Sequence, residues 1–193
     1  MGLTLTTGPA TEPVTLAEAK AHCRVDASDD DALITALIVA VRQRAEGLTG
    51  RALITQQWKL TGEAFPSGAL GLPKPPLVSV QTIKYLDTAG AQQTLSGSAY
   101  DVTTSELLGT IAPKWGTEWP SIRSQIAAVE IAYTAGYGAA AAVPQSIKAW
   151  MLCYIAAAYD NRSAVAVGQR DAAVVTLPYV DALLDDYIVT QVV

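Results

Sequence analysis

The chain has 193 residues, of which half are hydrophobic, 16% are charged and 7% are aromatic, and its formal net charge is −5. This length allows one sizeable core, or a core with a subdomain. The acidic balance and the absence of any lysine or arginine cluster argue against a broad phosphate-binding face. No apolar stretch approaches the ~20 residues that cross a bilayer.

Alanine and valine make up much of the apolar content, and few charges are present to solvate the surface of a monomer. This favours an oligomer, whose subunit contacts hide part of that surface; an alanine-rich monomer would have the same composition. We expect no signal peptide, because no basic region with an apolar run opens the chain. Cys23 and Cys153 lie within helical patterns and are expected to be free core residues.

Two helices are predicted in the first fifty residues. Thr15 and Glu18 have the spacing of a capping box, which opens a short helix over 15–23. Acidic residues open a second helix over 29–49, where their charge suits the positive end of the helix dipole. Apolar residues recur along it at helical spacing, at Leu33, Ile34, Leu37, Ile38, Val41, Ala45 and Leu48.

The following ninety residues have the alternating pattern of strands, broken by Gly- and Pro-rich turns. Strands are predicted at 54–61, 77–86, 92–95, 99–103, 109–112 and 127–133. The apolar residues of 77–86 change parity midway, which predicts a bulge near Gln81. The turn at 87–90 predicts a hairpin between the second and third of these strands.

Two more helices are predicted near the C-terminus. Pro144 opens one at 144–162, Pro178 opens the other at 178–188, and residues 163–177 connect them. The predicted fold class is therefore α+β, a small helical bundle with an inserted antiparallel β-rich subdomain. We expect residues 1–51 and 143–193 to form the helical core, and residues 52–142 to form the insertion.

The sequence has no recognisable catalytic, cofactor-binding or metal-binding arrangement. His22 is the only histidine, and its neighbour Cys23 would point elsewhere on a helix. The acidic run at 26–31 lacks the Gly and Glu positions of an EF-hand, so helix capping explains it better. We therefore predict no enzymatic activity, no metal and no cofactor.

Two tryptophans lie in the turn-rich segment 113–120, where each either staples the insertion or anchors a partner. We predict the staple role for Trp119. For Trp115 both roles remain open.

Several short motifs together resemble the head–tail connector proteins, or head-completion adaptors, of long-tailed bacteriophages, prophages and gene transfer agents. Their order and spacing carry the resemblance, which extends from about residue 10 to residue 165. The motifs are PVTLAEAK at 13–20, DDALI at 30–34, LTGR at 48–51, QW at 57–58, LPKPPLVSV at 72–80, WP at 119–120, YTAGYG at 133–138, VP at 143–144 and YDNR at 159–162.

The resemblance implies a structural virion protein in the neck between head and tail, made in the cytoplasm of a bacterial host. Such proteins form a ring, commonly of twelve subunits, beneath the portal. The ring extends the DNA channel during genome packaging and delivery, and it receives a stopper or tail-terminator protein. DNA would pass through without sequence-specific binding, and no membrane would be involved.

The resemblance also suggests which residues meet partners. The C-terminal segment 177–193 would reach the portal, with candidate residues Pro178, Tyr179, Leu183, Leu184, Tyr187 and Ile188. Candidates for the ring or neck interface are Arg42, Arg44, Trp115 and Tyr137.

Two other functions remain open at this stage. One is another neck or tail-completion protein that binds the tail tube. The more remote one is a small ligand-binding module or hydrolase that uses the β-rich insertion as a pocket, which would need a cluster of ionisable groups.

Overall fold

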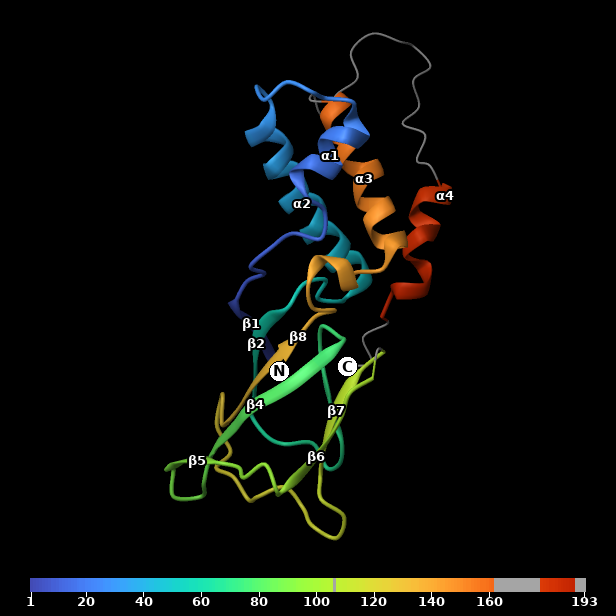
Figure 1. Ribbon diagram of the computed structural model, residues 1–193. Helices are drawn as coiled ribbons and strands as arrows, with labels where there is room; N and C mark the ends of the chain where they lie inside the picture. Colours follow the sequence, from blue (N-terminus) through green and yellow to red (C-terminus); the bar gives the residue numbers. More distant parts are fainter. Residues whose placement is uncertain (106, 162–177, 190–193) are drawn as a thin grey trace, which may run out of the picture. The chain divides into compact units, whose positions relative to one another are not determined.

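The computed structural model describes residues 1–105, 107–161 and 178–189 (Figure 1). Within these residues the chain divides into two compact units. The β unit contains Met1–Ala10 and Gly50–Tyr137, and the helical unit contains Thr11–Thr49 and Gly138–Thr190. Helices and antiparallel sheets are both present, so the predicted α+β class is confirmed.

The helical unit begins with α1 (Leu16–Cys23) and α2 (Asp31–Thr49). The predicted capping box is present: the Glu18 N–H donates to the Thr15 hydroxyl at 3.2 Å, and the Thr15 N–H donates to the Glu18 carboxylate at 2.7 Å. The Thr15 N–H and the Thr15 hydroxyl both donate to the Glu18 carboxylate, and these two bonds lower the pKa of Glu18 because they stabilise its charged form. The helix therefore begins where the spacing predicts.

Three further helical segments complete the unit. They are η1 (Ala140–Ala142), α3 (Gln145–Asp160), and α4 (Pro178–Asp181) continuing as the 3-10 helix η2 (Ala182–Tyr187). Pro144 is the N-cap of α3 rather than its first residue, with ψ at 138°. The connector predicted at 163–177 and the end of the chain lie outside the described residues.

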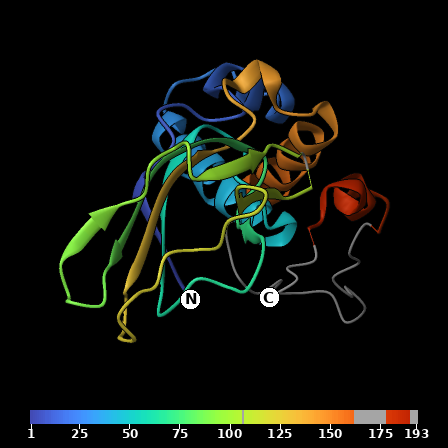
Figure 2. The same ribbon diagram turned by 90° about the horizontal axis from the view of Figure 1, so that it is seen from below.

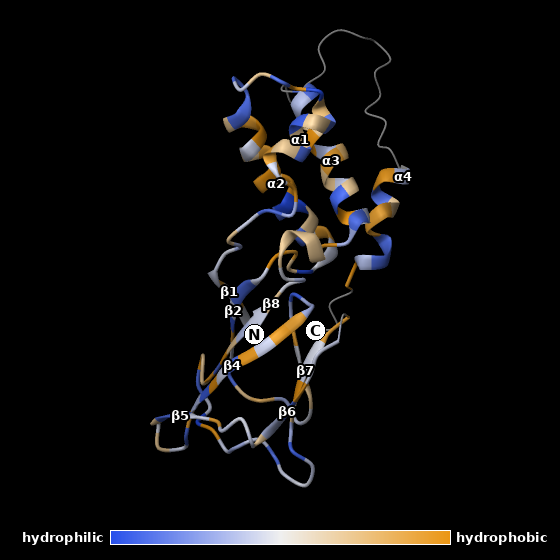
Figure 3. Cartoon of the chain, in the orientation of Figure 1, coloured by the Kyte–Doolittle hydropathy of each residue, from blue (hydrophilic) through white to orange (hydrophobic). Residues whose placement is uncertain are grey.

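The core of the helical unit forms where α2 and α3 pack together. Its fully or almost fully buried apolar side chains are Ile34, Ile38, Ala45, Ile147, Trp150, Met151 and Ile155. Figure 3 shows the apolar residues of these helices in orange. Leu33 and Leu48, which the periodicity placed on the same stripe, are each 37% exposed at its margin.

The β unit contains two antiparallel sheets. The five-stranded sheet has the order β1-β2-β8-β4-β5, and the three-stranded sheet has the order β3-β7-β6. The strands are β1 (Gly2–Thr7), β2 (Gln56–Gly62), β3 (Leu70–Leu72), β4 (Leu77–Leu86), β5 (Gln92–Thr94), β6 (Tyr100–Thr103), β7 (Gly109–Pro113) and β8 (Val129–Ala135). Figures 1 and 2 show β4 and β8 side by side.

Strand β8 is the centre of the larger sheet, since it pairs with β2 on one side and β4 on the other. Its residues alternate between buried and half-buried, with Val129, Ile131 and Tyr133 in the core. The register of β4 shifts between Val80 and Thr82, which confirms the predicted bulge at Gln81. The predicted β4–β5 hairpin is also confirmed, and β6 pairs with β7.

Two strands were not predicted as such. Residues 2–7 form β1 at the edge of the larger sheet. The Gly- and Pro-rich segment 62–76 contains the short strand β3. Both depend on pairing with distant strands, which local patterns do not reveal.

Gly136 follows β8 in a conformation that side chains rarely adopt, with φ at 127°. A Cβ built there would lie 2.3 Å from the carbonyl oxygen of Ile54. We predict that Gly136→Ala lowers the free energy of unfolding by about 2 kcal/mol or more, because it adds both backbone strain and a clash.

Urea unfolding followed by circular dichroism measures this change. The control is Gly47→Ala in α2, where an added Cβ meets nothing within 4 Å. That variant should be stabilised by about 0.5–1 kcal/mol. Equal stability of the two variants would contradict the assigned role of Gly136.

Candidate assembly surfaces

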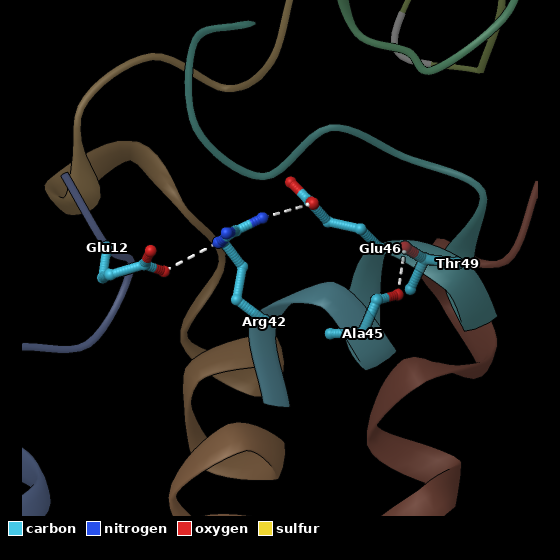
Figure 4. Close-up of polar contacts among 5 residues, drawn as sticks. All are labelled: Glu12, Arg42, Ala45, Glu46 and Thr49. Carbon is cyan, nitrogen blue, oxygen red and sulfur yellow. Dashed lines mark hydrogen bonds and ion pairs between the residues drawn. The ribbon is translucent and has the colours of Figure 1, made fainter. Parts of the chain in front are cut away.

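Arg42 forms a buried ion-pair network in the helical unit (Figure 4). Its Nε lies 2.7 Å from Glu12 Oε2 and its Nη1 lies 2.7 Å from Glu46 Oε2. Arg42 is only 6% exposed. Within the subunit, its guanidinium joins α2 to the segment before α1. Arg44, two residues further along, is exposed and remains available to a partner.

The segment formed by α4 and η2 packs on α3 through a small apolar contact and a polar one. Val180 and Leu184 are 4% and 2% exposed. The Asp181 carboxylate accepts hydrogen bonds from Tyr154 Oη at 2.6 Å and from Trp150 Nε1 at 3.1 Å. The rings of Trp150 and Tyr154 are themselves stacked, with centroids 4.1 Å apart.

These contacts divide the six predicted portal-binding residues. Leu184 is a core residue of the helical unit. Tyr179 and Ile188 are exposed, at 70% and 49%. Leu183 and Tyr187 are half-buried, and the side chain of Pro178 lies outside the described part of the chain.

The bonds around Asp181 also move two pKa values. The hydrogen bond from Tyr154, then that from Trp150, hold the pKa of Asp181 below its ordinary value, and Arg44 adds to this effect. The same bond raises the pKa of Tyr154, because the hydroxyl donates its proton to a carboxylate. At neutral pH Asp181 is therefore charged and the Tyr154 hydroxyl keeps its proton, as the observed hydrogen bond requires.

The two tryptophans of the β7–β8 connection have opposite environments. Trp119 stacks on Phe65 with centroids 4.7 Å apart, and its Nε1 donates to the Gly68 carbonyl at 2.8 Å. This confirms its predicted role as a staple. Trp115 is fully exposed, at 100%. Trp115 therefore does not staple the β unit, and of its two predicted roles only that of a partner anchor remains.

Tyr137, the last of the predicted interface residues, is half-buried at the end of the β unit. The guanidinium carbon of Arg51 lies 5.9 Å from the centre of its ring. This cation–π contact occupies one face of the ring within the same unit.

An open apolar hollow of about 450 Å³ lies on the helical unit. Its apolar lining comes from residues 14–16 at the start of α1, from α2 and from the region of η1, at Val14, Leu16, Ile38 and Ala139–Ala141. Glu12, Thr11, Thr15 and Thr35 add polar groups to the lining. Sequence periodicity did not predict this hollow, because three separate segments form it.

The described residues contain no group of three His, Cys, Asp or Glu side chains suited to a metal ion. His22 is exposed on α1. Burial is the main cause that raises the pKa of the neighbouring Cys23 thiol, which makes it a poor nucleophile at neutral pH. No described helix is both long and apolar enough to cross a membrane.

Comparison with known proteins gives a family match over part of the chain. Residues 13–98 match the model of the family described as "Phage gp6-like head-tail connector protein". The resemblance that the sequence motifs indicated is thus confirmed over these residues, which are similar to the head–tail connector proteins. No curated protein matches the sequence.

Solved structures match the whole chain. A chain in the virion of a native gene transfer agent (GTA) particle is 22% identical with a TM-score of 0.81. Chains in the neck of the empty GTA particle, computed with C6 symmetry, and of the native particle, computed with C12 symmetry, are 24% and 23% identical with TM-scores of 0.81 and 0.74. Each match covers 100% of this chain and 98% of the other. At this identity the likeness establishes a common fold.

The Arg42 network gives a prediction for stability. Arg42→Met should lower the free energy of unfolding by about 3 kcal/mol, because it leaves two partly buried carboxylates without their cation. Arg44→Met is the matched control, and its exposed site should change stability by no more than about 0.5 kcal/mol. Urea unfolding measures both, and equal effects would argue against the network.

The Asp181 bonds give a prediction for pH dependence. Folding lowers the pKa of Asp181. The contribution of this carboxylate to the free energy of unfolding is therefore fully present above the unfolded pKa of about 3.9, and it is lost as pH falls through the lower folded pKa. Asp181→Ala should therefore lower the thermal midpoint at pH 7, and its difference from the wild type should shrink towards about pH 2.

Asp181→Asn serves as the comparison, because it removes the charge but keeps an oxygen acceptor. Its midpoint at pH 7 should lie between those of the alanine variant and the wild type. A difference between wild type and Asp181→Ala that is the same at every pH would show that the carboxylate charge does not matter.

Proposed function

We propose that this protein is an adaptor of the virion neck, which forms a ring beneath the portal and extends the DNA channel towards the tail. The role is structural rather than enzymatic. The observation that carries the proposal is the combination of the connector family match over residues 13–98 with a fold shared, over the whole chain, with chains of GTA particles.

A ring of twelve subunits is the form we propose. One of the similar chains belongs to a neck described with C12 symmetry, and another to a neck described with C6 symmetry, a subgroup of it. A closed ring needs a head-to-tail contact, in which two different patches of the same chain meet. The low share of charged residues is compatible with surface that is covered in such an assembly.

The charge of the chain suits passage of DNA. With a net charge of −5, a ring of these subunits repels phosphate overall and limits adhesion. We propose that DNA crosses the ring without sequence-specific contacts. A stopper or tail-terminator protein would then close the ring on the side away from the portal.

For the portal contact we propose the exposed side of the α4–η2 segment, with Tyr179 and Ile188 as its apolar anchors. The opposite side is fixed to α3 by Val180, Leu184 and the Asp181 hydrogen bonds. Such an arrangement presents two large apolar side chains on a segment that is already docked, which reduces the ordering cost of binding.

Mass measurement of the purified protein, alone and with portal, tests the proposal. We expect the wild type to bind portal as a ring, and Tyr179→Ala to weaken this binding without changing the thermal midpoint. Leu33→Ala, at an exposed position of α2, is the control and should bind normally. A protein that stays monomeric and never associates with portal would refute the adaptor role.

The same experiment separates the adaptor from another neck or tail-completion protein. That alternative predicts binding to the tail tube in the absence of portal. Electron microscopy of particle necks would then place the chain on the tail side.

A further inference from the structure

Trp115 is held at the tip of a hydrogen-bonded turn between β7 and β8. The Thr117 N–H and hydroxyl both donate to the Lys114 carbonyl, at 2.9 and 2.7 Å. Gly116, at the third position of this turn, has φ at 77°, a conformation that favours glycine. The turn therefore has a defined geometry, with the indole at its second position.

The turn is also fixed to the adjoining strands. The Lys114 N–H donates to the Ala99 carbonyl at 3.1 Å, and Lys114 Nζ lies 2.6 Å from Asp101 Oδ1. Trp115, however, is 100% exposed, so it adds nothing to the packing of the unit. A rigidly presented, unpacked indole is the type of side chain that dominates binding energy at protein interfaces.

The surroundings of Trp115 favour an apolar protein partner over nucleic acid or an anionic membrane. The cation next to it, Lys114, is already paired with Asp101, and Glu118 on the same loop is acidic and exposed. Phosphate groups would need an excess of positive charge here. A pocket lined with apolar side chains on a partner protein would instead bury the Trp115 indole.

The apolar hollow of the helical unit has suitable chemistry and size. Its volume of about 450 Å³ accommodates one indole, and Val14 and Ile38 are almost fully buried in its lining. Glu12 adds a carboxylate to the lining, and its capacity exceeds the single bond that it accepts from Arg42 Nε. A buried indole N–H usually finds such an acceptor.

We propose that Trp115 of one copy inserts into this hollow on the neighbouring copy. The inference rests on the proposed function, because a closed ring requires two different and complementary patches on each chain. The protruding indole is one patch and the hollow is the other. The occupant of the hollow is thus a second copy of this protein.

Assembly of the purified full chain tests the contact. Trp115→Ala should weaken self-association at least about 30-fold, as for an interface hot spot, and should leave the thermal midpoint of the subunit unchanged. Thr35→Trp, which fills the hollow from an exposed position on α2, should have the same effect on association. Ile126→Ala is the matched control, since Ile126 is 83% exposed on the same β7–β8 connection, and it should associate normally.

Disulfide trapping provides a second readout that does not need a stable ring. In a chain with Cys23 and Cys153 replaced by alanine, Trp115→Cys combined with Thr35→Cys should form a ladder of covalent oligomers under oxidation. Ile126→Cys combined with Thr35→Cys should not.

The outcomes separate this contact from the proposed function. Rings that form equally well with Trp115→Ala, or the absence of the ladder, would overturn the contact and leave the adaptor role intact. Failure of the wild-type chain to bind portal would refute the adaptor role instead.

Discussion

The helical unit depends on the packing of α2 against α3, two helices that are separated in sequence by residues 50–144, which contain every described strand except β1. Buried isoleucines on both helices, such as Ile34 and Ile155, hold them together. The entropic cost of closing a long loop grows only slowly with its length. A large insertion between the two helices is therefore tolerable, provided that its two ends leave the helical unit near each other.

The insertion begins and ends close together within the β unit, at a point where one position has no room for a side chain. Gly136 follows β8 at a point where a Cβ would meet the Ile54 carbonyl oxygen. Close to it, the Gly136 N–H donates to the Pro76 carbonyl and the Ala52 N–H donates to the Pro75 carbonyl. These backbone bonds bind the entry and exit of the insertion to the segment that leads into β4.

Local signals predicted most of the elements from the sequence. The capping box at Thr15 and Glu18, the parity change near Gln81 and the helical stripe containing Ile34 and Ile38 each correspond to an observed feature. Strands β1 and β3 were missed, because their stability comes from partners that are distant in sequence. Helical periodicity also placed Leu33 and Leu48 on the buried stripe, but both are partly exposed, because the width of the buried face depends on the partner helix.

The candidate surfaces were harder to predict than the fold. A sequence shows that Arg42 is charged and that Leu184 is apolar, but not that the first is enclosed by two carboxylates and the second is in the core. Trp115 and Trp119 are only four positions apart, yet one is exposed and the other stacks on Phe65. Distinguishing a structural residue from a binding residue required the three-dimensional contacts.

The chain order also has a consequence for synthesis on the ribosome. The 95 residues from 50 to 144 separate the end of α2 at Thr49 from the start of α3 at Gln145. At about 5–20 residues per second, the apolar side of α2 waits roughly 5–20 s for its partner to be translated. Strands β2 to β8 emerge within that interval and β1 emerges before it, so the sheets can form first while the nascent helices still need shielding from other chains.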